Sequence, residues 1–185
     1  MANPSKVKGD KAERDAVAYL VEQVPHLVLP RAMRKLGAGR KEDTGDLHVF
    51  GDVAIQVRNY RMEQIGQAIR SSAVDALEQA ANGDLPYALG MVPYPRARAG
   101  TVRWLATWVT PPTDLDVEPI EFKLVSKALS WVRDDQGPYG YEARPRTSRI
   151  AHLVGPGAAV FMAPCEAWLE RYASTRTEEA LPFAA

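Results

Sequence analysis

The chain has 185 residues, of which 46% are hydrophobic and 25% are charged, and its formal net charge at pH 7 is +0. These values are ordinary for one globular domain with a buried core. The charge balance excludes a uniformly basic protein, so any affinity for nucleic acid must come from local patches. The single cysteine, Cys165, fits a reducing compartment. Because no apolar run approaches the length of a membrane span, we expect a cytoplasmic protein without a membrane partner.

Hydrophobic periodicity and turn residues predict alternating helices and strands. In chain order we expect a loose arm over 1–9, a helix over 10–24, a polar loop over 30–44, strands at about 46–50 and 53–59, a helix over 60–82, strands over 86–92 and 101–109, a strand over 158–162 and a helix over 164–172. This order predicts an α/β fold, with a mixed sheet flanked by helices.

All 185 residues are assigned to a single domain. Its core is expected over about 8–110 and 158–173. The segment 111–157 contains both strand-like and helix-like patterns between Pro and Gly turns, so we predict an insertion before the last strand without assigning its structure. From 174 to 185 we expect a mobile tail.

The most informative stretch runs from Thr44 to Asn59 and predicts two short strands joined by a Gly-Asp turn. Asp46 opens the first strand, and Gln56 and Arg58 lie two residues apart on the second. Because side chains alternate along a strand, Gln56 and Arg58 should share one face of the sheet, with the apolar residues between them on the other face.

An acid at the start of one strand, followed by a polar-x-basic pair on its hairpin partner, resembles the core of the PD-(D/E)xK nuclease superfamily, where the pair is Glu-x-Lys. The chain is similar to phage and archaeal Holliday-junction-resolvase-like proteins of that superfamily. Their N-terminal helix opens with Gly-x-x-x-Glu, as in Gly9 to Glu13, and their second strand ends in a run like Gln56-Val57-Arg58-Asn59. The resemblance covers roughly residues 8–110 and 158–172 and implies a restriction-endonuclease-like core.

In that family the hairpin acids hold Mg²⁺ and the lysine positions or activates the attacking water. The resemblance therefore implies Mg²⁺ ligands at Asp46, Gln56 and Glu13, and a catalytic set of these three residues with Arg58. Mg²⁺ prefers carboxylate oxygens, and it would activate water and stabilise the charge that develops on the phosphate. Gln56 contributes no charge, and Arg58 stays protonated, so it can hold a phosphate but cannot act as a base.

Each of these residues also has a structural explanation. Asp46 would be a turn aspartate, and Gln56 and Arg58 would be solvated strand residues in a site that has lost its chemistry. Glu13 would complete a capping box with Asp10 as the N-cap. On the helix after the hairpin, Glu63 and Gln67 are further candidates to replace a missing catalytic side chain.

Five cations precede the hairpin and would flank the site, where they could contact DNA phosphates. They are Arg31, Arg34, Lys35, Arg40 and Lys41. The leading hypothesis is a DNA-binding protein, and if active a Mg²⁺-dependent endonuclease of branched or duplex DNA in the bacterial cytoplasm, where a homodimer would match the two-fold symmetry of a junction. The alternatives are a DNA-binding module that does not cleave, and an inactive nuclease fold that serves as a head-completion or neck component of a phage virion.

Overall fold

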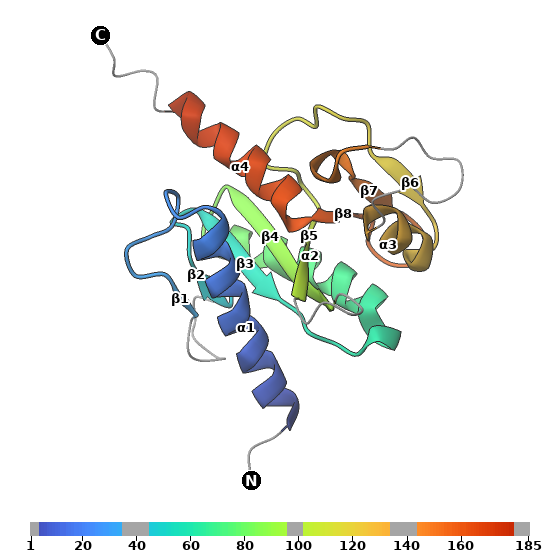
Figure 1. The fold of residues 1–185 in the computed structure, drawn as a ribbon, viewed down its shortest axis with the longest axis horizontal. Helices are drawn as coiled ribbons and strands as arrows, with labels where there is room; N and C mark the ends of the chain where they lie inside the picture. The colour runs from blue at the N-terminus through green and yellow to red at the C-terminus, as the bar shows by residue number, and fades with distance from the viewer. Residues whose placement is uncertain (1–3, 35–44, 96–101, 134–143, 180–185) are drawn as a thin grey trace.

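A mixed β-sheet with helices packed on both of its faces forms the centre of the protein (Figure 1). The computed structural model describes residues 4–34, 45–95, 102–133 and 144–179. The elements are α1 (Pro4–Gln23), β1 (Met33–Arg34), β2 (Leu47–His48), β3 (Val53–Val57), the 3-10 helix η1 (Met62–Gln64), α2 (Ile65–Asn82), β4 (Tyr87–Pro95), β5 (Val102–Trp108), β6 (Ile120–Phe122), α3 (Val125–Arg133), the 3-10 helix η2 (Arg146–Ser148), β7 (Ala151–Leu153), β8 (Val160–Pro164) and α4 (Cys165–Glu179). Within these ranges, no helix combines the length and the apolar character needed to cross a membrane.

The described strands lie in the order β1-β2-β3-β4-β5-β8-β7-β6. Neighbouring strands are antiparallel except for the pairs β3–β4 and β6–β7, which are parallel. Parallel strands need a long crossover connection, and the helices α2 and α3 provide it for these two pairs. The predicted fold class, a mixed sheet flanked by helices, is therefore confirmed.

The two faces of the sheet are covered by different helices. Leu20 of α1 and Trp168 of α4 share one buried cluster with Ile55 of β3. On the other face, Ala76 of α2 packs against Ala54 of β3, and α3 joins α2 in a further cluster. Figure 1 shows α1 and α4 in front of the sheet and α2 behind it. Even-numbered residues of β3 therefore face α2, and odd-numbered residues face α1 and α4.

Helix α1 begins at Pro4, so the arm predicted over 1–9 is helical from that residue onward. Proline is tolerated in a first helical turn because its missing N–H would have no partner there. Lys8 Nζ then donates a hydrogen bond to Tyr60 O at 3.1 Å. Because Asp10 lies inside the helix rather than at its start, the predicted capping box between Asp10 and Glu13 is wrong.

The segment 111–157, predicted as an insertion, contributes strands to the same sheet. β6 and β7 lie beyond β8 at the edge of the sheet, and Ala128, Trp131 and Val132 of α3 are buried against this part of it. The strand-like and helix-like patterns in this segment therefore belong to two successive elements. The described part of the segment extends the core instead of forming a separate unit.

Helix α4 continues to Glu179, past the end predicted at Tyr172. The Arg176 guanidinium lies 5.1 Å from the centre of the Tyr172 ring and 5.8 Å from that of Tyr87, and it pairs with Asp52. The Tyr172 hydroxyl donates to Asp52 Oδ1 at 2.7 Å. These contacts hold the last turns of α4 on the β2–β3 turn, so the tail predicted from Ser174 is helical as far as Glu179.

Candidate functional site

A glycine fixes the start of β2 against β3. Gly45 has a φ of +104°, and a Cβ at this position would lie 2.9 Å from both the backbone N and the backbone O of Ile55. The left-handed backbone and the close approach both favour glycine. Asp46 N donates to Ile55 O at 2.8 Å, which places the Asp46 side chain beside the end of β3.

The Asp46 carboxylate meets the two residues that the hairpin motif pairs with it. Its Oδ2 accepts hydrogen bonds from Gln56 Nε2 at 2.5 Å and from Val57 N at 3.0 Å. Arg58 Nη1 lies 3.6 Å from the same oxygen. The structure therefore brings Asp46, Gln56 and Arg58 together, as the strand spacing predicts.

Gln56 is buried in this contact, with only 1% of its surface exposed. Its Nε2 is bonded to Asp46, whereas its Oε1 is buried and accepts no hydrogen bond from the described residues. Burying an amide oxygen without a partner is costly. Gln56 is therefore not the solvated strand residue of the alternative explanation.

Arg58 forms its strongest contacts with a residue that the sequence reasoning missed, Asp75 of α2. Arg58 Nη2 and Nε donate to Asp75 Oδ2 at 2.6 and 3.2 Å, and Nη1 donates to the carbonyl of Val57 at 3.3 Å. About a quarter to a third of each side chain of this ion pair is exposed. The guanidinium is therefore held between two carboxylates, those of Asp46 and Asp75.

A signal for Asp75 was present in the helical spacing. Asp75 lies three residues after Ser72 and one before Ala76, both buried on the sheet side of α2, which places it at the border of the buried face. Glu63 and Gln67, the candidates considered on this part of the chain, are both exposed. The helix after the hairpin therefore does supply an acid to the site, but two turns further along.

Glu13 lines a pocket together with Arg58. The pocket has a volume of about 590 Å³. It is lined by Lys8, Gly9, Glu13, Val57, Arg58, Asn59, Tyr60, Arg61 and Gln64. We call it the Arg58 pocket. Glu13 of α1 therefore shares this pocket with Arg58.

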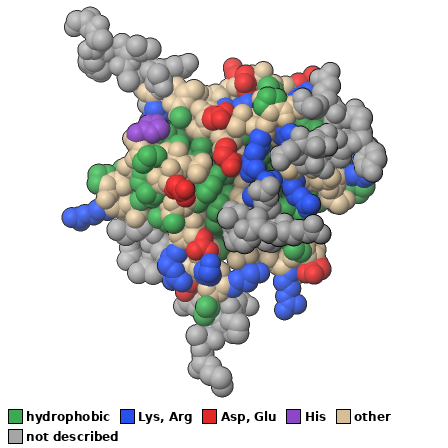
Figure 2. All heavy atoms as spheres, viewed as in Figure 1, with side chains coloured by type: hydrophobic (Ala, Val, Ile, Leu, Met, Phe, Trp, Pro, Cys, Tyr) green, Lys and Arg blue, Asp and Glu red, His purple; other side chains and the backbone are tan. Residues whose placement is uncertain are grey.

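The cations of the Arg58 pocket differ from the predicted DNA-binding set. Arg31 is exposed, Arg34 lies in β1, and Lys35, Arg40 and Lys41 fall outside the described residues. The pocket instead brings Lys8 and Arg61 to Arg58. Figure 2 shows Lys and Arg side chains gathered on the lower part of the face that carries α1, with carboxylates among them. Sequence reasoning missed Lys8 because it placed that residue in a loose arm.

Mg²⁺ prefers carboxylate oxygens, and the predicted ligand set offers two carboxylates, at Asp46 and Glu13, beside the amide of Gln56. Among the residues that the structure describes, no group of three or more His, Cys, Asp or Glu side chains could hold a metal ion. The two carboxylates nearest the motif both contact the Arg58 guanidinium, whose positive charge would repel a divalent cation. The Arg58 guanidinium therefore supplies a positive charge between Asp46 and Asp75, at the position that the resemblance assigns to a lysine.

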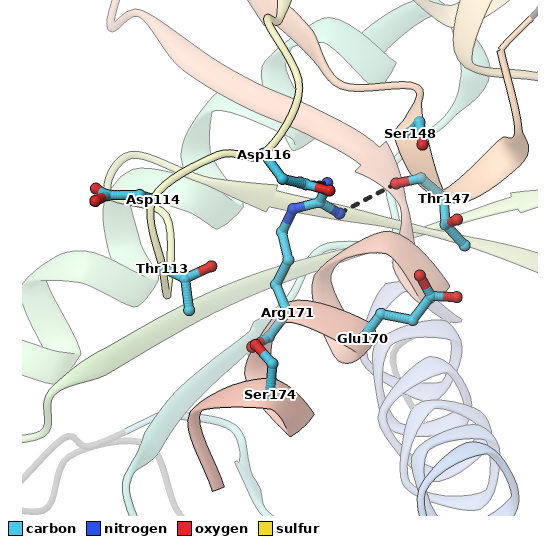
Figure 3. Close-up of a pocket in the computed structure, with 8 residues that line it drawn as sticks. All are labelled: Thr113, Asp114, Asp116, Thr147, Ser148, Glu170, Arg171 and Ser174. Atoms are coloured by element: carbon cyan, nitrogen blue, oxygen red, sulfur yellow. Dashed lines mark hydrogen bonds and ion pairs between the residues drawn. The ribbon is translucent and has the colours of Figure 1, made fainter. Parts of the chain in front are cut away.

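A second pocket, of about 610 Å³, lies between α4 and two loops on the far side of α4 from the hairpin (Figure 3). It is lined by Thr113, Asp114, Asp116, Thr147, Ser148, Glu170, Arg171 and Ser174. Figure 3 shows Arg171 reaching from α4 toward Asp116, with which it pairs, and it also donates to Thr147 O at 3.1 Å. Arg171 is buried and is the only cation among these lining residues, which include three carboxylates, so the pocket is unsuited to phosphate.

Two buried titratable groups lie away from both pockets. Burial raises the pKa of the Cys165 thiol and of the neighbouring Tyr19 hydroxyl above their ordinary values. Because the thiolate is the reactive form of cysteine, a fully buried Cys165 with a raised pKa is an inert core residue. Neither group supplies a nucleophile to the site.

In comparisons with protein families, with curated proteins and with solved structures, nothing matches this chain.

Proposed function

We propose that this protein binds the phosphate backbone of DNA at the Arg58 pocket. The pocket lies at the end of a nuclease-like hairpin, where Arg58, rather than a bound metal ion, would contact the phosphate. The observation that carries the proposal is the position of Arg58, which contacts Asp46 of the hairpin motif and also lines a pocket with Lys8 and Arg61. A planar guanidinium can bind two phosphate oxygens at once, and on Arg58 a phosphate would compete with Asp75 for the Nη2 and Nε donors. Lys8, bonded to Tyr60 O, adds a second positive charge that is already held at the rim.

A Mg²⁺-dependent endonuclease of the Holliday-junction-resolvase type is the second candidate. The observation that favours it is the buried Gln56 Oε1 beside Asp46, an acceptor without a described donor. On either proposal the resemblance suggests a homodimer in the bacterial cytoplasm. The third candidate, an inactive assembly component of a phage virion, would need no DNA affinity at all.

Fluorescence anisotropy with a labelled DNA duplex tests the proposal. We expect the affinity for DNA to fall as the salt concentration rises, because the protein's Lys and Arg side chains displace counterions from the DNA phosphates when they bind. Arg58→Ala should lower the affinity about tenfold at low salt and reduce the slope of log K against log[salt] by about one. Lys127→Ala, which removes an exposed cation of α3 outside the pocket, is the matched control and should change little. A natural chain without any DNA affinity at low salt would overturn the proposal in favour of the virion component.

The ion pair with Asp75 predicts a variant that binds DNA more tightly. Asp75→Asn keeps the shape of the side chain and removes a negative charge 2.6 Å from Arg58 Nη2, so the phosphate no longer competes with a carboxylate. We expect an affinity gain of about two- to fivefold, as for removal of a partly exposed ion-pair partner. Glu78→Gln, at an exposed position of the same helix, makes the same change in net charge. Equal gains in the two variants would show a general charge effect instead.

A further inference from the structure

The Arg58 pocket contains an aromatic ring and two amides in addition to its cations. Tyr60 lines the pocket with 37% of its surface exposed, and Asn59 and Gln64 line the same pocket. The loop that carries Tyr60 connects β3 to η1, and its backbone is tied to α1 by the hydrogen bond from Lys8 Nζ to Tyr60 O. The lining of this pocket therefore combines an exposed aromatic residue and two amide residues with three cations.

These groups match the parts of a nucleotide. Cations bind the phosphate, an exposed aromatic ring stacks on the face of a base, and amides can donate to and accept from a base edge. The volume of about 590 Å³ lies within the range of roughly 300–1,000 Å³ that is usual for small-molecule pockets. In a duplex the faces of the bases are covered by their neighbours, so only an unpaired base can present its face to Tyr60.

We propose that the Arg58 pocket receives one unpaired nucleotide of a DNA strand, with its phosphate at Lys8, Arg58 and Arg61 and its base on Tyr60. This inference rests on the proposed DNA binding and narrows the substrate to DNA with single-stranded character, such as a gap, a fork or a frayed end.

The experiment compares a labelled single strand with a duplex of the same sequence at low salt. We expect the natural chain to prefer the single strand, and Tyr60→Ala to weaken single-strand binding by roughly 5- to 100-fold, as loss of a base–aromatic stack does, with little effect on the duplex. Tyr60→Phe keeps the ring and should restore most of the affinity. Met62→Ala, an exposed side chain two residues away and outside the pocket, serves as the control.

A fluorescent base analogue within the strand reports stacking directly. Its fluorescence should be quenched on binding by the natural chain and by Tyr60→Phe, but not by Tyr60→Ala. Equal affinity for both DNA forms, with no selective effect of Tyr60→Ala, would overturn the nucleotide site and leave the proposed phosphate binding intact. If neither DNA form binds at low salt, the proposed function fails as well.

Discussion

The double variant Gln56→Glu, Arg58→Lys is expected to bind Mg²⁺ and to cleave DNA in its presence, far above the natural chain. Gln56 Nε2 lies 2.5 Å from Asp46 Oδ2, so a glutamate at this position would place a second carboxylate within reach of the first. Lysine would replace the guanidinium that contacts both Asp46 and Asp75. Its pKa can shift into a range useful for proton transfer, which that of arginine cannot.

Thermal unfolding measures metal binding in this variant independently of cleavage. Without Mg²⁺ the two close carboxylates repel each other, and the free energy of unfolding should fall by roughly 3 kcal/mol. At a Mg²⁺ concentration about 100-fold above its Kd, binding to the folded state contributes about 2.7 kcal/mol. For a chain of this size that gain raises the Tm by roughly 5–10 °C, whereas the Tm of the natural chain should stay unchanged.

Two further proteins make the result interpretable. Asp46→Ala in the double-variant background should abolish both the Mg²⁺-dependent rise in Tm and the cleavage. Gln67→Glu with Arg31→Lys makes the same chemical changes at exposed positions and should show neither. A folded double variant that gains no stability from Mg²⁺ and cuts no DNA would contradict a nuclease-like site. Cleavage by the natural chain that Asp46→Ala stops would instead establish the second candidate function.

The geometry of the hairpin could be predicted from the sequence because it depends on local rules. Alternation along a strand places Gln56 and Arg58 on one face, and the Gly45 turn sets Asp46 beside them, where its Oδ2 meets Gln56 Nε2 at 2.5 Å. These positions depend only on residues within the hairpin. What local rules did not predict is that Gln56 is fully buried, since its burial depends on α2 covering the sheet.

The partners of the hairpin depend on packing between distant segments, which sequence patterns constrain weakly. Asp75 reaches Arg58 only because of where α2 lies along the sheet and how the helix is rotated about its own axis. Lys8 reaches the Arg58 pocket only because α1 begins at Pro4, although a flexible arm is equally compatible with the polar residues around it. The same reason explains 111–157, where β6 and β7 find their place in the sheet through contacts with β8 that no local pattern encodes.

Arg58 links the fold to the proposed function. In the motif that this hairpin resembles, two acids and a lysine share the site, and a divalent metal completes its positive charge. Here the guanidinium is part of the chain and is present in every molecule. DNA binding should therefore survive treatment with EDTA, which separates this arrangement from one that needs a divalent cation to recruit phosphate.

Replacing Gly90 with alanine is expected to cause a large loss of stability. A Cβ at Gly90 would lie 2.1 Å from Thr107 Oγ1, 2.6 Å from Ser72 C and 2.8 Å from Ala73 N. Two of these atoms belong to the backbone of α2 and cannot rotate away, so the helix must move off the sheet. Overpacking of this kind costs about 3 kcal/mol, which urea denaturation or a fall in Tm of roughly 6–12 °C would register.

Two comparisons test that the cost comes from the approach of α2. Gly9→Ala adds the same methyl group in α1, where nothing lies within 4 Å, and should stabilise the protein by about 0.5–1 kcal/mol through helix propensity. Adding Thr107→Ala to Gly90→Ala removes the nearest clash but also the buried Ser72–Thr107 hydrogen bond of 2.8 Å, so it should recover only part of the loss. Because Gly90 is paired with Gln56 across β3 and β4, a displaced α2 would also carry Asp75 away from Arg58. If the Gly90→Ala protein is as stable as the natural chain, α2 does not approach Gly90 as closely as the distances above. The contact between Asp75 and Arg58, which depends on that approach, would then be in question as well.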